Sequence, residues 1–208
     1  MLTRKDVGAG ASGIADQVLL SATNLIVGLT LARQLEPASF GVYVIAFAVM
    51  LAGSSAQLSL VTDPLLILGA PKKGPEQSRY LAALLWIQVM VSLAVAAATA
   101  VGGEGLRLAW GQGSQIPVAL IAVAAISVPI QLQAFFRAIL FARLRAAAAL
   151  CNDAIFCALR LAAVALLIHF DRLSVYTALL AGGAAASLAA IAGAVACRDV
   201  LGAPAERF

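Results

Sequence analysis

Four ionisable side chains stand within or at the edges of long apolar runs of this sequence: Asp16, Asp63, Asp153 and Arg160. A charged side chain near the centre of a bilayer costs about 2.5–3.5 kcal/mol on insertion scales, and residues kept there usually serve a function. Arg160 is the strongest candidate, because roughly 15 Å of helix, at 1.5 Å per residue, separate it from either end of its run. Its guanidinium cannot easily reach the membrane surface over that distance, so we predict that it faces the protein interior or a wet cavity.

The chemistry of Arg160 leaves two interpretations open. One is an ion pair with an acidic residue on another helix. The other is a bound substrate anion, such as a phosphate, which the planar and bidentate guanidinium suits. Asp153 lies seven positions earlier, on the same helix face but about two turns away, so we do not expect the two side chains to meet.

The three acids are predicted near helix ends on one side of the membrane. There they would lie in the wet interface, and the carboxylates of Asp16 and Asp153 would suit the positive dipole of a first helical turn. The alternative is a functional role inside the protein. Uncharged polar residues in the same runs either join helices by hydrogen bonds or line a pore. They are Gln17, Asn24, Gln57, Gln88, Gln131 and Gln133.

The composition identifies the elements that must position these residues. Of 208 residues, 62% are hydrophobic and 12% are charged, against about half and about a quarter in a soluble domain. This balance excludes a soluble enzyme and a disordered chain, and the scattered Lys and Arg exclude a nucleic-acid-binding face. Three cysteines match no zinc pattern and no nucleophile–base set occurs, so we expect no enzyme, metal or cofactor. What is left is an all-α integral membrane bundle.

Hydropathy predicts a single transmembrane lobe over residues 1–208, with six spans of about 20 residues or more. The spans cover about 13–32, 42–68, 80–101, 116–136, 150–170 and 175–197. The predicted connections are a turn at 35–41, a flexible glycine-rich loop at 102–115, a surface link at 142–149 and a tight turn at Asp171. Pro64 is expected to kink or end its helix, and Pro129 is expected to kink the fourth span near Gln131 and Gln133.

The positive charges are distributed unevenly between alternate connections. The amino terminus, the second and fourth connections and the tail hold ten Lys and Arg residues, among them Arg137, whereas the other connections hold three. Short loops rich in Lys and Arg stay in the cytoplasm. We therefore predict that both termini are cytoplasmic.

Two groups of segments carry a resemblance to a known family. The first contains Asp16-Gln17, Ser21, Asn24, Leu31-Ala32-Arg33 and Pro37-x-x-Phe40-Gly41-x-Tyr43. The second contains Phe136-Arg137, Phe141-Ala142-Arg143 and Asn152-Asp153. These segments resemble the first two helices, and the fourth and fifth helices, of Wzx-type flippases in the multidrug/oligosaccharidyl-lipid/polysaccharide exporter superfamily.

The resemblance implies a half-size polysaccharide exporter. Members of that family have two six-helix lobes, which alternate access to move oligosaccharides linked to polyprenyl pyrophosphate across the bacterial inner (plasma) membrane. A second six-helix lobe, from another copy or another chain, is then the expected partner, and a proton or sodium gradient is the expected energy source. Arg160, Arg137 and Asn24 are expected to bind the substrate. Asp16, Asp153 and Gln17 are expected at the cytoplasmic entrance or in ion coupling.

Two other functions stay open on the sequence alone. A small-molecule or drug exporter of the same superfamily would use Asp16 and Asp153 for a cationic cargo, so these acids would matter more than Arg160. A non-transporting membrane subunit of polysaccharide biosynthesis would assist an assembly without moving cargo.

Overall fold

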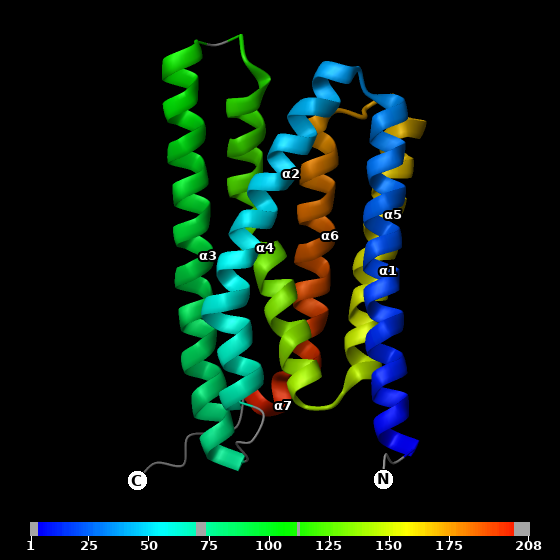
Figure 1. The fold of residues 1–208 in the computed structure, drawn as a ribbon, viewed down its shortest axis with the longest axis vertical. Coiled ribbons are helices and arrows are strands. Elements are labelled where there is room, and N and C mark those ends of the chain that lie inside the picture. The colour runs from blue at the N-terminus through cyan, green and yellow to red at the C-terminus, as the bar shows by residue number, and fades with distance from the viewer. Residues whose placement is uncertain (1–3, 70–73, 112, 202–208) are drawn as a thin grey trace.

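The computed structural model describes residues 4–69, 74–111 and 113–201. Six long helices run up and down through this part of the chain (Figure 1), and each is long and apolar enough to cross a membrane. The predicted all-helical architecture with six membrane-length helices is therefore confirmed. The helices are α1 (Arg4–Gln34), α2 (Pro37–Gln57), α3 (Gly74–Trp110), α4 (Gln115–Ala142), α5 (Ala146–His169), α6 (Val175–Ala196) and the short α7 (Arg198–Leu201).

The central helix of the bundle is α4. It packs against α3 and α6 and also contacts α2 and α5, whereas α1 packs mainly against α5. Among the six long helices, α4 and α6 are the most buried, while α1, α2 and α3 leave most of their apolar residues exposed. Polar side chains of α4 therefore face the interior, and the exposed apolar faces suit contact with lipid.

The glycine-rich segment predicted as a flexible loop at 102–115 is helical from 102 to 110, so the prediction is wrong for those residues. Only residues 111–114 connect α3 to α4. Gly103 packs closely on α4, because a Cβ there would come within 3.1 Å of the Leu120 Cβ. Glu104 and Arg107 form an ion pair across one turn of α3, with 2.5 Å between Oε1 and Nη2. Gly103, one of the glycines that suggested a loop, instead lets α3 approach α4.

Two other predicted connections are shorter than expected. The turn predicted at 35–41 is only two residues long, because α2 begins at Pro37, and proline fits the first turn of a helix, where its missing N–H is not needed. The surface link predicted at 142–149 is a three-residue turn in which Leu144 has a φ of 55°. Because α4 extends past its predicted end, Arg137 lies inside a helix and is not a loop charge.

The second span changes from α-helix to π-helical turns around Pro64. After α2 the chain continues as two π-helical turns, Leu58–Thr62 and Leu65–Gly69, on either side of Pro64. Proline lacks the N–H that an α-helix needs, so a wider hydrogen-bonding pattern replaces it there. Tyr80 of α3 donates a hydrogen bond of 3.1 Å to the Pro64 carbonyl oxygen. The helix α4 continues through Pro129.

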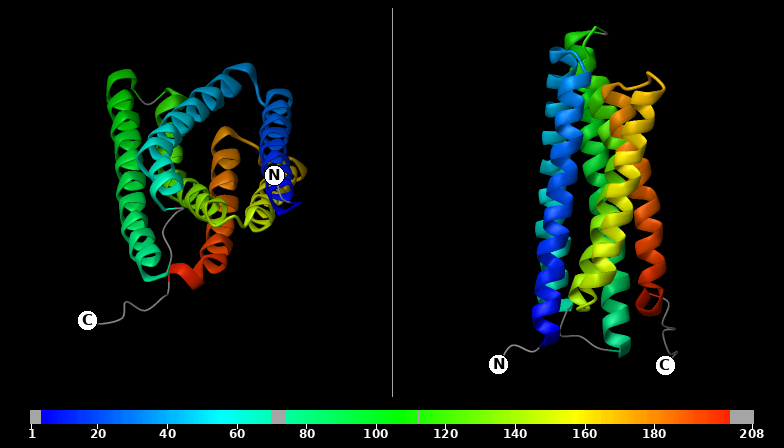
Figure 2. Two further views of the ribbon diagram at one scale, coloured as in Figure 1. Left: turned by 60° about the horizontal axis from the view of Figure 1, so that its bottom comes forward. Right: turned by 90° about the vertical axis from the view of Figure 1, so that its right-hand side faces the viewer.

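One end of the bundle carries the start of α1, the α4–α5 turn and α7 (Figure 1, Figure 2). Arg143 of the turn contacts the Asp199 carboxylate of α7 at 2.8 Å, and Arg145 lies 3.9 Å from it. The hydrogen bond from Arg143 lowers the pKa of Asp199 below its usual value. Which side of the membrane this end faces stays a prediction. Three basic residues behind that prediction lie outside the described residues: Lys72, Lys73 and Arg207.

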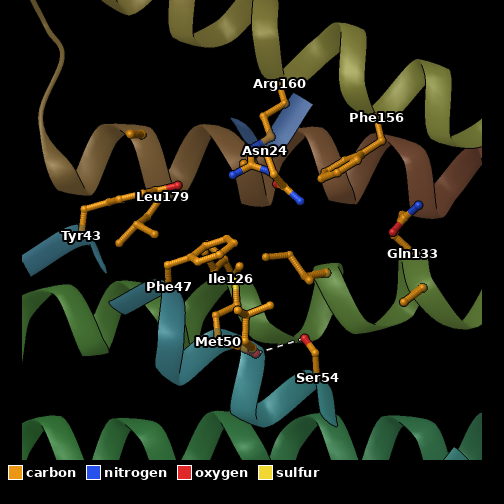
Figure 3. Close-up of a pocket in the computed structure, with 15 residues that line it drawn as sticks. Asn24, Tyr43, Phe47, Met50, Ser54, Ile126, Gln133, Phe156, Arg160 and Leu179 are labelled. Atoms are coloured by element: carbon orange, nitrogen blue, oxygen red, sulfur yellow. Dashed lines mark hydrogen bonds between the residues drawn. The ribbon is translucent and has the colours of Figure 1, made fainter. Parts of the chain in front are cut away.

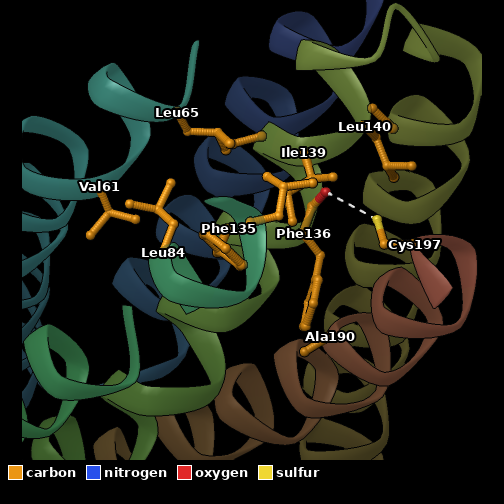
Figure 4. Close-up of a cluster of buried hydrophobic side chains, with 12 residues drawn as sticks. Val61, Leu65, Leu84, Phe135, Phe136, Ile139, Leu140, Ala190 and Cys197 are labelled. Atoms are coloured by element: carbon orange, nitrogen blue, oxygen red, sulfur yellow. Dashed lines mark hydrogen bonds between the residues drawn. The ribbon is translucent and has the colours of Figure 1, made fainter. Parts of the chain in front are cut away.

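Two buried apolar clusters fill opposite ends of the bundle. The first joins the π-helical turns, α3 and α4, and it contains the fully buried Phe135 and Ile139 (Figure 4). The second joins α1, α2, α4, α5 and α6 around residues such as Leu31. Gly193 of α6 packs on Phe136 so tightly that a Cβ there would come within 2.7 Å of the Phe136 Cβ. The small residues of α6 thus let it approach α4 inside this bundle.

Candidate functional site

Arg160 lies inside the bundle, as predicted, with 9% of its surface exposed. Its Nη1 donates a hydrogen bond of 2.6 Å to Asn24 Oδ1 of α1, and its Cζ lies 6.0 Å from the centre of the Phe156 ring. Gly182 of α6 is also close, since a Cβ there would lie 3.8 Å from the Arg160 Nε. The guanidinium is therefore enclosed by α1, α5 and α6 near the middle of the helices (Figure 3).

The hydrogen-bond partner of Arg160 is an amide. Among the side chains that the structure describes, no carboxylate lies within ion-pair distance of this guanidinium. The interpretation of Arg160 as half of an ion pair with an acid on another helix is therefore wrong for the described residues. The remaining N–H donors of the guanidinium are available to a ligand.

A cavity of about 180 Å³ lies beside Arg160. Five helices, α1, α2, α4, α5 and α6, contribute to its wall. Its lining combines polar residues, Asn24, Ser54 and Gln133, with apolar ones, Phe47, Met50 and Leu179 (Figure 3). One positive charge next to apolar surface suits the charged head and the apolar chain of an amphiphile.

A second buried group, which we name the charge cluster, consists of Asp16 of α1, Arg137 of α4 and Asp153 of α5. Arg137 donates from Nη2 and from Nε to Asp16 Oδ2, the latter at 3.1 Å, and its Nε lies 2.5 Å from Asp153 Oδ2. Both carboxylates are fully buried, whereas 27% of the Arg137 side chain is exposed. The guanidinium also lies 5.2 Å from the centre of the Phe141 ring. A single cation thus joins three helices.

The two acids of the charge cluster lie deeper than the sequence predicted. Asp16 is about three turns into α1 and Asp153 about two turns into α5, so neither lies in a first helical turn. Neither lies in a wet interface, because both side chains are inaccessible to solvent. The reason is that α1 and α5 begin earlier than predicted. Asp63, the third acid, is exposed beside Pro64.

The charge cluster contains two carboxylates but only one guanidinium. Asp153 Oδ1 accepts a hydrogen bond of 2.6 Å from Gln133 Nε2, but Asp16 Oδ1 and Asp153 Oδ2 accept none from the described residues. Asp153 Oδ2 lies close to Arg137 Nε, yet the single N–H of that nitrogen is directed to Asp16. With both acids ionised, two buried negative charges therefore share one positive charge.

Gln133 belongs to both sites. Its Nε2 is bonded to Asp153, and its side chain also lines the cavity. It lies one turn before Arg137 on α4, and residues four apart share a helix face. In Figure 3 it stands at one end of the cavity, with Phe156 and Arg160 farther along the wall. The charge cluster and the cavity are therefore adjacent sites that share one amide.

The predicted site residue Gln17 joins neither site. The two sites bring together the other five predicted residues: Asp16, Asn24, Arg137, Asp153 and Arg160. Successive residues of a helix point about 100° apart, and the side chain before Gln17 faces inward. Gln17 therefore lies on an exposed face of α1, apart from the acids with which it was grouped.

A third polar group, which we name the glutamine chain, joins α2, α3 and α4. Gln57 donates to Gln88 at 3.2 Å, and Gln88 donates to Ser92 at 2.8 Å. Ser92 in turn donates to Gln131 at 3.0 Å, and all four side chains are buried. Ser92 was missed by the sequence analysis, although its spacing of four residues from Gln88 indicates a shared helix face. The glutamine chain is uncharged and does not line the cavity, so it serves to join helices.

The cavity and the charge cluster offer different chemistry. The cavity presents an arginine with free donors, which can bind an anion such as a phosphate. The charge cluster presents an excess of carboxylate, which can bind a proton or another cation. No family model, no curated protein and no solved structure matches this chain. The residues of these two sites are therefore the basis for a functional assignment.

Proposed function

We propose that this protein is one lobe of a membrane transporter, and that its cavity holds the anionic head group of an amphiphilic cargo at Arg160. The observation that carries the proposal is a buried guanidinium with one amide partner and no carboxylate partner among the described side chains. A buried charge without a partner of opposite sign is costly. Such a residue is retained where a ligand supplies that partner.

The size and lining of the cavity indicate the class of cargo. Its volume of about 180 Å³ is below the roughly 300–1,000 Å³ of pockets that enclose a drug-sized ligand, so it suits a phosphate or pyrophosphate group better than an oligosaccharide. Phe47, Met50 and Leu179 supply apolar surface for the first isoprene units of a carrier lipid. The cargo that combines these features is an oligosaccharide on polyprenyl pyrophosphate, which the sequence resemblance also implies.

The sugar part of such a cargo needs space outside this cavity, and a second lobe would supply it. Transporters built from two repeats place their site between the halves and expose it to each side by rocking one half against the other. The partner in this proposal is a second copy of the chain or a separate six-helix chain in the bacterial inner membrane. The end that carries the start of α1 and α7 faces the cytoplasm.

Arg137 takes a role different from the substrate binding that the resemblance implies. Its guanidinium contacts Asp16 and Asp153, so its charge is already matched. We assign substrate binding to Arg160 and Asn24. Arg137 holds α1, α4 and α5 together.

The cavity lining argues against a cationic drug as the cargo. An exporter of cations needs a carboxylate facing its cargo, and the described lining of the cavity contains none. The two buried acids, Asp16 and Asp153, contact Arg137 instead. The polar head group that fits this site is therefore an anion.

Binding of farnesyl pyrophosphate to the protein in lipid nanodiscs tests the proposal, because this probe joins the anion to a short isoprenoid. We expect saturable binding to the wild type and a loss of at least tenfold in affinity, about 1.4 kcal/mol, for Arg160→Gln. Arg160→Lys should lose less, because it keeps the charge without the fork. Arg107→Gln is the matched control, since Arg107 pairs with Glu104 outside the cavity.

Transport itself is tested by restoring surface polysaccharide in a flippase-deficient strain, with a neighbouring six-helix chain supplied where one exists. We expect the wild type to restore the polysaccharide and Arg160→Gln to fail. Equal binding of the probe by the wild type and Arg160→Gln would overturn the assignment of the head group. Binding without transport in vesicles that also contain the second lobe would identify a non-transporting subunit.

A further inference from the structure

The buried charges of the cavity and of the charge cluster balance only when they are counted together. Asp16 and Asp153 bring two negative charges, and Arg137 and Arg160 bring two positive charges. Arg137 contacts both acids, whereas Arg160 has no carboxylate in contact among the described side chains. The excess negative charge of the cluster is therefore matched at a distance by the excess positive charge of the cavity.

We infer that Arg160 and the charge cluster form one electroneutral set, so that an anion bound at Arg160 makes the Asp16–Asp153 pair take up one proton. The inference rests on the proposed function for its ligand. In the empty protein the four charges sum to zero and no proton is required. An anion that neutralises Arg160 leaves the cluster with one uncompensated negative charge. A proton from water then binds one carboxylate oxygen, converts that carboxylate to a carboxylic acid and restores the balance.

On α5, Asp153 and Arg160 are close enough for electrostatic coupling between their charges. Asp153 and Arg160 lie seven residues apart, about 10 Å along the helix axis, and they project from the same helix face. In a buried environment of low dielectric constant, charges at this separation interact far more strongly than they do in water. Adding or removing a charge at Arg160 therefore directly changes the electrostatic energy of the charged Asp153 carboxylate.

In the described part of the chain, the groups that face the Asp16–Asp153 pair come from α1, α4 and α5. Arg137 approaches from α4, and Arg160 and Cys157 lie on α5, with Cys157 between the arginine and Asp153 along the helix. The Cys157 thiol is buried and uncharged, and it lies near Thr23 of α1. Neither Cys157 nor Thr23 supplies a further charge, so the electroneutral set consists of the two acids and the two arginines.

The orphaned oxygens of the cluster mark where the proton goes. Asp16 Oδ1 and Asp153 Oδ2 are fully buried and accept no hydrogen bond from the described residues. Two carboxylates that share a site readily hold one proton between them. Gln133 acts as a positioning residue, because its Nε2 occupies Asp153 Oδ1 and so leaves Oδ2 for the proton.

Infrared spectroscopy of the ligand-free protein at pH 7 tests the inference, because a protonated carboxylic acid has a carbonyl band that a carboxylate lacks. Arg160→Gln removes the charge that a bound anion would neutralise. We expect no band from a buried carboxylic acid in the wild type and a band equal to about one acid per protein in Arg160→Gln. Arg160→Lys is the matched control, and it should show no band because it keeps the charge.

A second set of variants assigns the band. Adding Asp153→Asn to Arg160→Gln should remove it, because one acid then faces one guanidinium and no proton is needed. Adding Asp63→Asn should leave it, since Asp63 is exposed and outside the set. Adding Gln133→Leu should move the band to higher frequency, because the acid loses a hydrogen-bond donor, whereas Gln131→Leu should not move it.

Several outcomes would overturn the inference. A band already present in the wild type would mean that Arg160 does not balance the cluster, and its absence from Arg160→Gln would mean the same. An unmoved band in the Gln133→Leu variant would remove the positioning role of Gln133. If the band behaves as expected but farnesyl pyrophosphate does not bind, the proposed function fails and the charge coupling stands. If the probe binds and the band never forms, the coupling fails alone.

Discussion

Arg137 and Arg160 lie in the same bundle but have opposite surroundings. Arg137 contacts two fully buried carboxylates and is partly exposed. Arg160 is more deeply buried and has a single amide, Asn24, as its hydrogen-bond partner. Residue type is the same in both places, so the difference lies in the charges that the neighbouring helices bring.

The comparison shows how the environment of a buried arginine indicates its role. A guanidinium surrounded by acids joins helices, because its charge is satisfied within the protein. A guanidinium without an acid beside a cavity has binding capacity left for a ligand. The family-like motif indicated Arg137 as a substrate-binding residue, and the position of Arg160 deep within an apolar run indicated Arg160. Only the contacts in the structure distinguish the roles of the two arginines.

The same substitution at both arginines gives the largest expected difference. Arg137→Gln leaves two buried carboxylates without a cation, so we expect it to lower the free energy of unfolding by about 3–5 kcal/mol. Arg160→Gln removes a charge that balances the charge cluster only at a distance, and one proton taken up by the Asp16–Asp153 pair restores the balance, so we expect a smaller loss of about 1–3 kcal/mol. Unfolding of both variants in detergent, followed by circular dichroism, measures the two values. An equal loss at both positions would contradict the distinction between them.

Removing the whole charge cluster should reverse most of that loss. The triple variant Asp16→Asn, Arg137→Gln and Asp153→Asn removes all three charges, keeps the shapes of the two acids and shortens the side chain at 137. Replacing a complete buried ionic group by uncharged residues is often neutral, so we expect it to recover at least about 2 kcal/mol relative to Arg137→Gln alone. The same unfolding assay measures the recovery. A triple variant as unstable as Arg137→Gln would show that the cluster contributes through packing and not through charge.

The number of helices could be predicted from the sequence, but their lengths could not. Long apolar runs define membrane-length helices whatever their neighbours are, which is why all six were found. The helix ends depend on contacts between helices. The segment around Gly103 is helical because it packs on α4, and Arg137 lies within α4 because that helix extends beyond its most apolar part.

The depth of Arg160 could be predicted, whereas its partner could not. Depth follows from position within an apolar run. The choice of Asn24 as partner, and the contact between Asp16 and Arg137 across 121 residues of sequence, depend on how each helix is rotated in the bundle. Apolar residues surround these helices almost evenly, so the sequence contains little signal for that rotation. Gln133 was recognised as polar, but its place between two sites required the fold.

The glutamine chain provides an uncharged comparison with the charge cluster. Gln88→Leu removes two buried hydrogen bonds, one with Gln57 and one with Ser92, although Gln57 keeps Thr62 and Ser92 keeps Gln131 as partners. We expect it to lower the free energy of unfolding by about 1–3 kcal/mol, or about 0.5–1.5 kcal/mol for each lost hydrogen bond, which is less than for Arg137→Gln because the groups involved carry no charge. Binding of farnesyl pyrophosphate should be unchanged, since the glutamine chain does not line the cavity. Gln17→Leu, on an exposed face of α1, is the control and should change neither quantity.

The smallest effect is expected where an arginine pairs with an acid in water, at Arg143 and Asp199. The pKa of Asp199 is lowered by this contact, so its stabilising effect is present at neutral pH and is lost as pH falls through the lowered pKa, below about pH 4. Asp199→Asn should therefore cost less than about 1 kcal/mol at pH 7, and the cost should be smaller at pH 3. Unfolding of the wild type and the variant at both values checks this. A cost of equal size at pH 7 and pH 3 would show that Asp199 acts by something other than its charge.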